Sequence, residues 1–227
     1  MGQFIELRTA DSQQLPVYVA EPAAQPKGAV VVIQEIFGVN SHVRAVADGY
    51  AAAGYLAVAP AIFHRVKPNV ELGYGPDDMS AGVALKTATE ALPAPGAMGD
   101  IQEAIKYASR AGKVGIVGYC YGGLLAWRAA CELEGLSAAV PYYGGGVTTP
   151  DEIARKPKVP VMAHFGAKDK HITLDSVEAF RKAHPEVELH IYEADHGFNC
   201  DQRGSYDAPS AKLARERTLE FFAKHLG

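Results

Sequence analysis

The sequence predicts an α/β fold in which helices cover both faces of a mostly parallel β-sheet and an antiparallel hairpin lies at its N-terminal edge. Two continuous apolar runs, residues 28–34 and 55–60, lack the polar alternation of half-exposed strands and are typical of parallel strands buried on both faces. Segments with helical spacing alternate with these and later apolar runs. This alternation favours parallel pairing through right-handed crossovers.

The elements of this fold can be placed in order along the chain. Residues 4–8 and 15–20 alternate apolar and polar side chains around a polar turn, which indicates the hairpin. Further strands are predicted at residues 28–34, 55–60, 113–119, 136–143, 159–165 and 187–192. Helices are predicted at residues 41–53, 77–91, 98–111, 121–134, 174–183 and 209–225. Asn40 or Ser41 would cap the first helix, and Gly54 would end it.

Residues 61–96 form the least regular part of the sequence. Four prolines interrupt this segment, and the helix at 77–91 is the one regular element that its pattern supports. Long segments of this kind between core elements usually serve as lids or binding loops. We therefore expect residues 61–96 to have that role.

The composition fits one domain spanning residues 1–227. A hydrophobic content of 48% with 21% charged residues is ordinary for a globular protein, and no linker or repeat divides the chain. The net charge of −4 gives no reason to expect nucleic acid or an acidic membrane as a partner. Neither a signal peptide nor a transmembrane run is visible, so a cytoplasmic location is expected. The odd number of cysteines, three, without a Cys-x-x-Cys pair, argues against a disulfide framework or a zinc site.

The pattern Gly118-x-Cys120-x-Gly122-Gly123 lies where a predicted strand meets a predicted helix. It matches the sharp strand-to-helix turn called the nucleophile elbow, with cysteine in the place of the usual serine. Glycines leave room at such a tight reversal, and the sulfur would lie at a helix N-terminus, where free N–H groups favour the thiolate. The alternative is that Cys120 is a small buried side chain without a chemical role.

Asp169 and His196 each follow a predicted strand, at residues 159–165 and 187–192. Because the carboxyl ends of parallel strands meet at one edge of a sheet, both side chains are expected near Cys120. The chain order nucleophile, acid, histidine is that of α/β-hydrolases. His196 would take the proton of Cys120 and return it to the leaving group, while Asp169 would orient the imidazole.

Other roles stay open for these residues. Asp169 could cap the turn that follows it, and Asp175 or Asp195 could then take its place beside the histidine. His196 could also be a surface histidine. A metal site made of His190, Asp195 and His196 shows no recognised ligand spacing, so no metal is expected.

Glu35 opens the loop after the predicted strand at residues 28–34. In α/β-hydrolases this loop supplies one N–H group of the oxyanion hole, and the residue after the nucleophile supplies the other. These would be the backbone N–H groups of Ile36 and Tyr121. A carboxylate opposes a developing oxyanion, so Glu35 is either a partner of the thiol or a helix-start acid that faces solvent.

Four motifs of the chain are familiar in combination: Gln34-Glu35-Ile36-Phe37-Gly38, Gly118-Tyr-Cys120-Tyr-Gly-Gly123, Gly166-Ala-Lys-Asp169 and Asp195-His196-Gly-Phe198. In this order, the chain resembles the dienelactone hydrolase (carboxymethylenebutenolidase) family of the α/β-hydrolase superfamily over nearly its whole length. The resemblance implies an α/β-hydrolase fold and a triad of Cys120, His196 and Asp169 that hydrolyses an enol lactone through an acyl-thiol intermediate. It also implies that Glu35 interacts with the nucleophile, shifting it between a protected thiol and an activated thiolate.

The sequence departs from this family at the residues that would bind a substrate carboxylate. The family uses two arginines, one from the lid region and one placed four residues beyond the histidine. Here Cys200 occupies the second position, and no arginine lies between Val66 and Ser109. Arg203 or Arg65 could substitute, although a lysine would not reproduce the paired hydrogen bonds of a guanidinium.

The sequence therefore predicts a cysteine-dependent hydrolase of a small ester or lactone. We expect it to need no cofactor and to act as a monomer or weak homodimer. A ligand-binding protein without hydrolytic activity on the same scaffold is the alternative, and a peptidase or acyltransferase is a third interpretation.

Overall fold

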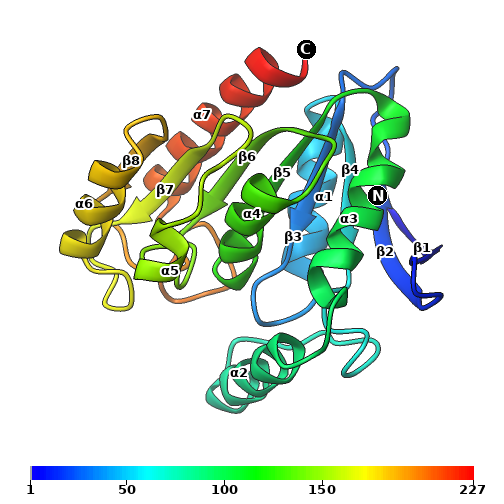
Figure 1. Cartoon of the computed structure of the whole chain (residues 1–227), viewed down its shortest axis with the longest axis horizontal. Coiled ribbons are helices and arrows are strands. Elements are labelled where there is room, and N and C mark those ends of the chain that lie inside the picture. Colours follow the sequence, from blue (N-terminus) through cyan, green and yellow to red (C-terminus); the bar gives the residue numbers. More distant parts are fainter. Residues whose placement is uncertain (1) are drawn as a thin grey trace.

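An eight-stranded β-sheet runs through the whole molecule (Figure 1). The computed structural model describes residues 2–227. The strands are β1 Gln3–Arg8, β2 Gln14–Ala20, β3 Ala29–Ile33, β4 Leu56–Pro60, β5 Val114–Tyr119, β6 Leu136–Tyr142, β7 Met162–Gly166 and β8 Glu188–Tyr192. Their order in the sheet is β1-β2-β4-β3-β5-β6-β7-β8. β1 pairs with β2 and β2 with β4 in antiparallel fashion, whereas every later pair is parallel.

Helices cover both faces of this sheet. They are α1 Ser41–Ala52, α2 Pro76–Glu90, α3 Gly96–Ala108, α4 Tyr121–Glu132, α5 Pro150–Ile153, α6 Leu174–Ala183 and α7 Ala208–Leu226. In Figure 1, α1 and α7 lie behind the sheet and α3 and α4 in front of it. Trp127 of α4 packs against Phe180 of α6, which places α6 in the same layer as α4. α2 stands apart from both layers (Figure 1).

The predicted α/β fold and its N-terminal hairpin are confirmed. Asn40 is the residue that caps α1, because its side chain accepts a hydrogen bond from the Val43 N–H. The sequence pattern did not predict α5, since a helix of four residues is too short to show a hydrophobic period. Within residues 2–227, no helix is long and apolar enough to cross a membrane.

The central strands are buried because helices cover them on both sides. Every residue of β3, β4 and β5 is buried, as their continuous apolar sequences predict. The parallel strands all end at the same edge of the sheet. The loops that leave this edge after β3, β5, β7 and β8 carry Glu35, Cys120, Asp169 and His196, respectively.

The turn from β5 into α4 is held in shape by close backbone contacts. Cys120, at the turn, has φ 54° and ψ −114°, a backbone conformation that residues other than glycine rarely adopt. A Cβ atom at Gly122 would overlap the carbonyl oxygens of Ile33 and Gln34 at the end of β3. Glycine at this position therefore lets the first turn of α4 lie directly against the neighbouring strand.

Gly122→Ala is expected to lower the free energy of unfolding by about 3 kcal/mol, because the added methyl group meets rigid backbone oxygens. Gly145→Ala is the matched control, since a Cβ there meets no described atom within 4 Å. Urea denaturation of both variants measures the difference. Equal stability of the two would contradict the close approach of α4 to β3.

Candidate active site

A cavity of about 420 Å³ opens at the carboxyl edge of the sheet. Its wall is made by the loops after β3, β5, β6, β7 and β8, by the start of α4 and by α2. The lining residues are Ile36, Phe37, Met79, Val83, Lys86, Cys120, Tyr121, Gly145, Gly146, His171, His196 and Arg203. The cavity therefore brings together residues that are far apart in the sequence.

Cys120 lies at the N-terminal cap of α4, on the wall of this cavity. Its N–H donates to the carbonyl oxygen of Tyr142 at 3.1 Å, and its own carbonyl oxygen accepts from the N–H groups of Gly123 at 3.0 Å and Gly145 at 3.2 Å. These three hydrogen bonds hold the backbone of Cys120 in its unusual conformation. The side chain is consequently presented to the cavity from a rigid turn.

His196 joins Cys120 to Asp169. Its Nδ1–H donates to Asp169 Oδ2 at 2.7 Å. The other carboxylate oxygen of Asp169 accepts from the backbone N–H groups of His171 at 2.8 Å and Ile172 at 3.0 Å. Asp169 is thus held on both oxygens, and it fixes the orientation of the imidazole.

The pKa values of this group follow from burial and from these hydrogen bonds. Burial lowers the pKa of His196, but hydrogen bonds to Asp169 and Cys120, with the charges of both, outweigh burial and raise it to about 10. Burial raises the pKa of Asp169, but the hydrogen bond to His196 and the two backbone N–H groups lower it below its usual value. The contacts of the imidazole therefore favour its protonated form.

The competing sequence interpretations can be compared with these contacts. Asp195 accepts from the backbone N–H of His196, at 2.7 Å, and Asp175 is an exposed residue in the first turn of α6. The carboxylate at the imidazole is that of Asp169. His190 bonds to Glu188 at 2.9 Å, and among residues 2–227 His190, Asp195 and His196 do not converge as a set of metal ligands.

Glu35 is buried and makes an ion pair with Arg203. It is 1% exposed, and its Oε1 accepts from Arg203 Nη1 at 3.0 Å. Oε2 is buried without a hydrogen-bond partner in the described chain. This burial excludes an acid that faces solvent. Of the two arginines considered from sequence, Arg203 lines the cavity, whereas Arg65 is bound by Asp11 and Asp100.

Tyr143 is a site residue that the sequence interpretation missed. It is fully buried with φ 34°, and its ring lies 5.2 Å from that of His196. Burial raises the pKa of its phenol well above the usual value, and the nearby Glu35 carboxylate acts in the same direction. The available signal was its place at the carboxyl end of a predicted strand, before three glycines.

The structure also brings Ile36 and Tyr121 to the cavity wall beside Cys120. α2 rests on the loop that carries Ile36, since a Cβ atom at Gly82 would lie 2.5 Å from the Ile36 carbonyl oxygen. Glycine at this point lets α2 approach the backbone of the loop directly. The helix in the segment 61–96 therefore forms part of the cavity, through Met79, Val83 and Lys86.

Cys120→Ala is expected to lower the pKa of His196 below its value of about 10, because the variant removes a contact that raises it. An NMR titration of the histidine ring signals measures this change. Cys131→Ala, which alters a cysteine near the end of α4, should leave the pKa unchanged. An identical His196 pKa in wild type and Cys120→Ala would contradict the contact between sulfur and imidazole.

Comparisons with known proteins give a consistent result. The sequence profile of the dienelactone hydrolase family matches residues 15–226. The chain is 35% identical to a protein of Synechocystis sp. named "putative carboxymethylenebutenolidase", over 97% of this chain and 96% of that protein. It is 33% identical to the carboxymethylenebutenolidase of Pseudomonas putida, over 96% of this chain and 95% of that protein.

A solved structure shows the same similarity in three dimensions. The "putative dienelactone hydrolase" of Klebsiella pneumoniae superposes with a TM-score of 0.83 at 32% identity, covering 99% of this chain and 98% of that one. The match therefore covers nearly the whole of both chains. The chain belongs to the dienelactone hydrolase family.

Proposed function

We propose that the protein is a cysteine-dependent hydrolase of a small ester or lactone, acting through an acyl-thiol intermediate on Cys120. The observation that carries this proposal is the imidazole of His196, whose Nδ1 is hydrogen-bonded to Asp169 at 2.7 Å and which lines the same cavity as Cys120. A merely structural cysteine needs neither an oriented imidazole nor access to a cavity. Family membership supports the same reaction class.

In the first half of the reaction, the Cys120 sulfur attacks the carbonyl carbon of the substrate and forms a tetrahedral intermediate. The carbon–oxygen bond to the leaving group then breaks, and the imidazolium of His196 gives its proton to the departing oxygen. The products of this step are an acylated Cys120 and an alcohol or enol. In a lactone, that alcohol stays attached to the acyl group.

In the second half, water must attack the thioester. Acylation removes the negative charge of the sulfur, one of the causes that raise the pKa of His196, so the neutral imidazole now takes a proton from water. The resulting hydroxide attacks the thioester carbon, and the carbon–sulfur bond breaks. The carboxylic acid product leaves, and the proton on His196 restores the starting pair.

The backbone N–H groups of Ile36 and Tyr121 are the proposed donors to the oxyanion of both intermediates. Support comes from their positions beside Cys120 on the cavity wall, and from the place of Tyr121 in the first turn of α4, whose N–H groups have no acceptor within the helix. The contact between Gly82 and the Ile36 carbonyl would help to hold the first of these peptides in place.

Glu35 is proposed to modulate the nucleophile, and Arg203 to bind a carboxylate on the substrate. The Glu35 carboxylate is buried with one oxygen unpaired, and the other is bound to Arg203, which also lines the cavity. A substrate carboxylate that reaches Arg203 would compete with Glu35 for the guanidinium. Binding of such a substrate would thereby change the charge that Glu35 presents to Cys120.

Cys120→Ala is expected to reduce kcat for a p-nitrophenyl ester of a short acid by about a thousandfold or more, because no nucleophile remains to form the acyl intermediate. Release of p-nitrophenol measures the rate. Cys131→Ala should retain the wild-type rate. Undiminished turnover in Cys120→Ala would refute the assignment of Cys120 as the nucleophile. If the wild-type protein binds esters or lactones but hydrolyses none of them, the result would favour the alternative of a ligand-binding protein.

Arg203→Gln is expected to raise KM for an ester with a free carboxylate by about tenfold, because a charge-assisted hydrogen bond to the substrate is lost. KM for the matching methyl-capped substrate should change much less. Because Arg203→Gln also leaves Glu35 buried without its partner, the Glu35→Gln/Arg203→Gln double variant is measured in parallel. Arg181→Gln, on the exposed face of α6, is the control. Equal changes for both substrates would count against carboxylate binding by Arg203.

A further inference from the structure

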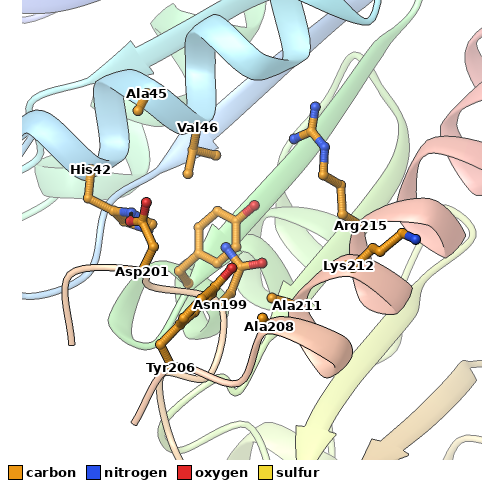
Figure 2. A pocket seen from close by; sticks show the side chains of 11 residues that line it. His42, Ala45, Val46, Asn199, Asp201, Tyr206, Ala208, Ala211, Lys212 and Arg215 are labelled. Atoms are coloured by element: carbon orange, nitrogen blue, oxygen red, sulfur yellow. Dashed lines mark hydrogen bonds and ion pairs between the residues drawn. The ribbon is translucent and has the colours of Figure 1, made fainter. Parts of the chain in front are cut away.

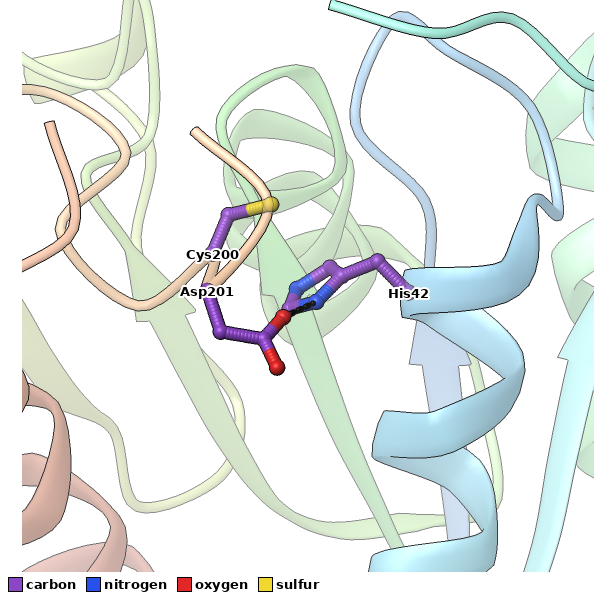
Figure 3. Close-up of side chains that lie close together, drawn as sticks. All are labelled: His42, Cys200 and Asp201. Atoms are coloured by element: carbon purple, nitrogen blue, oxygen red, sulfur yellow. Dashed lines mark hydrogen bonds and ion pairs between the residues drawn. The ribbon is translucent and has the colours of Figure 1, made fainter. Parts of the chain in front are cut away.

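Two further cavities differ in how they relate to the catalytic one. The first has a volume of about 340 Å³ and lies between α1, α7 and the loop after β8 (Figure 2). At one side of it, the Nδ1–H of His42 donates to Asp201 Oδ1 at 3.0 Å (Figure 3). Its lining residues are all different from those of the catalytic cavity. The second cavity has a volume of about 560 Å³ and shares Tyr121 with the catalytic one, so a molecule bound at Cys120 could reach it.

The second cavity continues along the helices that wall the catalytic cavity. On α4 its lining residues are Tyr121, Leu125, Arg128 and Glu132. These positions are spaced by four, three and four residues, so they lie on one face of the helix. On α2 the catalytic cavity is lined by Met79, Val83 and Lys86, and Glu90 continues the same spacing into the second cavity. The two cavities therefore lie end to end between α2 and α4.

Tyr121 stands at the junction of the two cavities. Lys86 Nζ lies 5.6 Å from the centre of its ring, and the ring of Phe63 stacks against it at a centroid distance of 6.2 Å. Burial raises the pKa of the phenol, the charge of Glu90 acts in the same direction, and that of Arg128 opposes it. The side chain of Tyr121 therefore extends from the reaction centre toward residues that line the second cavity.

The charged residues of the second cavity are already paired. Glu90 lies 3.4 Å from Lys86, Arg128 lies 2.8 Å from Glu152, and Glu132 forms an ion pair with Arg155. Because each of these charges has a partner within the protein, the wall offers little to select an ion. An uncharged ligand is the better fit.

The uncharged part of this wall is largely apolar. It includes Leu92, Ala94, Pro95, Met98 and Leu125. Leu92 is half-buried, and in the described chain it is not one of the hydrophobic side chains that pack against the main core. An apolar ligand would remove this surface from water, which is favourable in proportion to the area covered. The second cavity therefore suits an aliphatic chain.

The geometry of the reaction decides which part of a substrate faces this cavity. The leaving oxygen must lie beside His196, which gives it a proton, and His196 belongs to the loop after β8. The described residues that line the second cavity come from α2, α3, α4 and the segment 91–95, and not from that loop. The acyl group is bonded to Cys120 and extends away from the leaving group. The second cavity therefore lies on the acyl side of the reaction centre.

We propose that the acyl chain of the substrate runs from Cys120 past Tyr121 into the second cavity, and that the enzyme prefers esters of medium-length aliphatic acids. This inference rests on the proposed function, since the thioester at Cys120 fixes where the chain begins. Leu125 and Arg128 lie roughly 6 Å and 10 Å beyond Tyr121 along the axis of α4. An extended octanoyl chain spans roughly 9 Å and a butanoyl chain roughly 4 Å, because C–C bonds of about 1.5 Å zigzag. The octanoyl chain reaches Leu125, and the butanoyl chain does not.

The dependence of the rate on chain length tests this proposal. We measure kcat/KM of the wild type for p-nitrophenyl butanoate and p-nitrophenyl octanoate, which have the same leaving group. The octanoate should give a kcat/KM higher by about tenfold or more, because further CH₂ groups leave water. An equal or lower value for the octanoate would overturn the proposal, while hydrolysis of the butanoate would still support the proposed function.

Variants of the second cavity locate the chain. Ala94→Trp fills part of the cavity, and Leu92→Asp places a charge in its apolar wall. Each should lower the ratio of octanoate to butanoate kcat/KM by about fivefold or more. Ala91→Trp is the matched control, since Ala91 is exposed and lies outside the lining of the cavity, and it should keep the wild-type ratio. Circular dichroism checks the folding of all three. A wild-type ratio in both Ala94→Trp and Leu92→Asp would refute the proposal.

Binding without turnover separates this inference from the proposed chemistry. Calorimetry on Cys120→Ala should show methyl octanoate binding about tenfold or more tightly than methyl butanoate. Adding Ala94→Trp to this variant should remove most of the difference. Equal binding of the two esters to Cys120→Ala would overturn the place of the chain even if the wild type hydrolysed both. Absence of hydrolysis by the wild type would instead contradict the proposed function.

Discussion

The left-handed backbone of Cys120 is the constraint on which the arrangement of the site depends. A residue with a side chain adopts this conformation at a cost, so the surrounding structure must impose it. The Cys120 N–H donates to Tyr142, and the Cys120 carbonyl oxygen accepts from the N–H groups of Gly123 and Gly145. Gly122 lets α4 lie against the end of β3. The same contact sets the distance between the helix start and the loop that begins at Glu35. The position of the sulfur is therefore a consequence of how closely one helix and one strand can approach.

The buried charged groups near Cys120 are arranged as two ion pairs. Two buried carboxylates, Glu35 and Asp169, each have a cationic partner, Arg203 and His196. Burial raises the cost of leaving any of these charges unpaired, so the four groups stabilise one another only as two complete pairs. The hydrogen bond to Asp169, with a smaller contribution from Cys120, raises the pKa of His196 to about 10. A reaction that alters the charge on sulfur also alters the proton affinity of the base, which links the two halves of the proposed reaction.

Much of the fold and part of the site could be predicted from the sequence. Buried parallel strands have continuous apolar sequences, and their carboxyl ends share one edge, so the chain positions of Cys120, Asp169 and His196 were enough to place them together. The ion pair of Glu35 with Arg203 could not be predicted, because it joins residues 168 positions apart and neither belongs to a periodic element. Tyr143 was missed for a related reason: its aromatic side chain is typical of the end of a strand.

A covalent acyl group on Cys120 is the most direct test of the proposed chemistry. The protein is mixed with an ester whose acyl group is released slowly, quenched in acid during turnover, digested and examined by mass spectrometry. We expect the mass of the acyl group on the peptide that contains Cys120, and its disappearance as turnover ends. Hydrolysis with no acylated Cys120 peptide, or with the acyl group on Cys131 or Cys200 instead, would contradict the account.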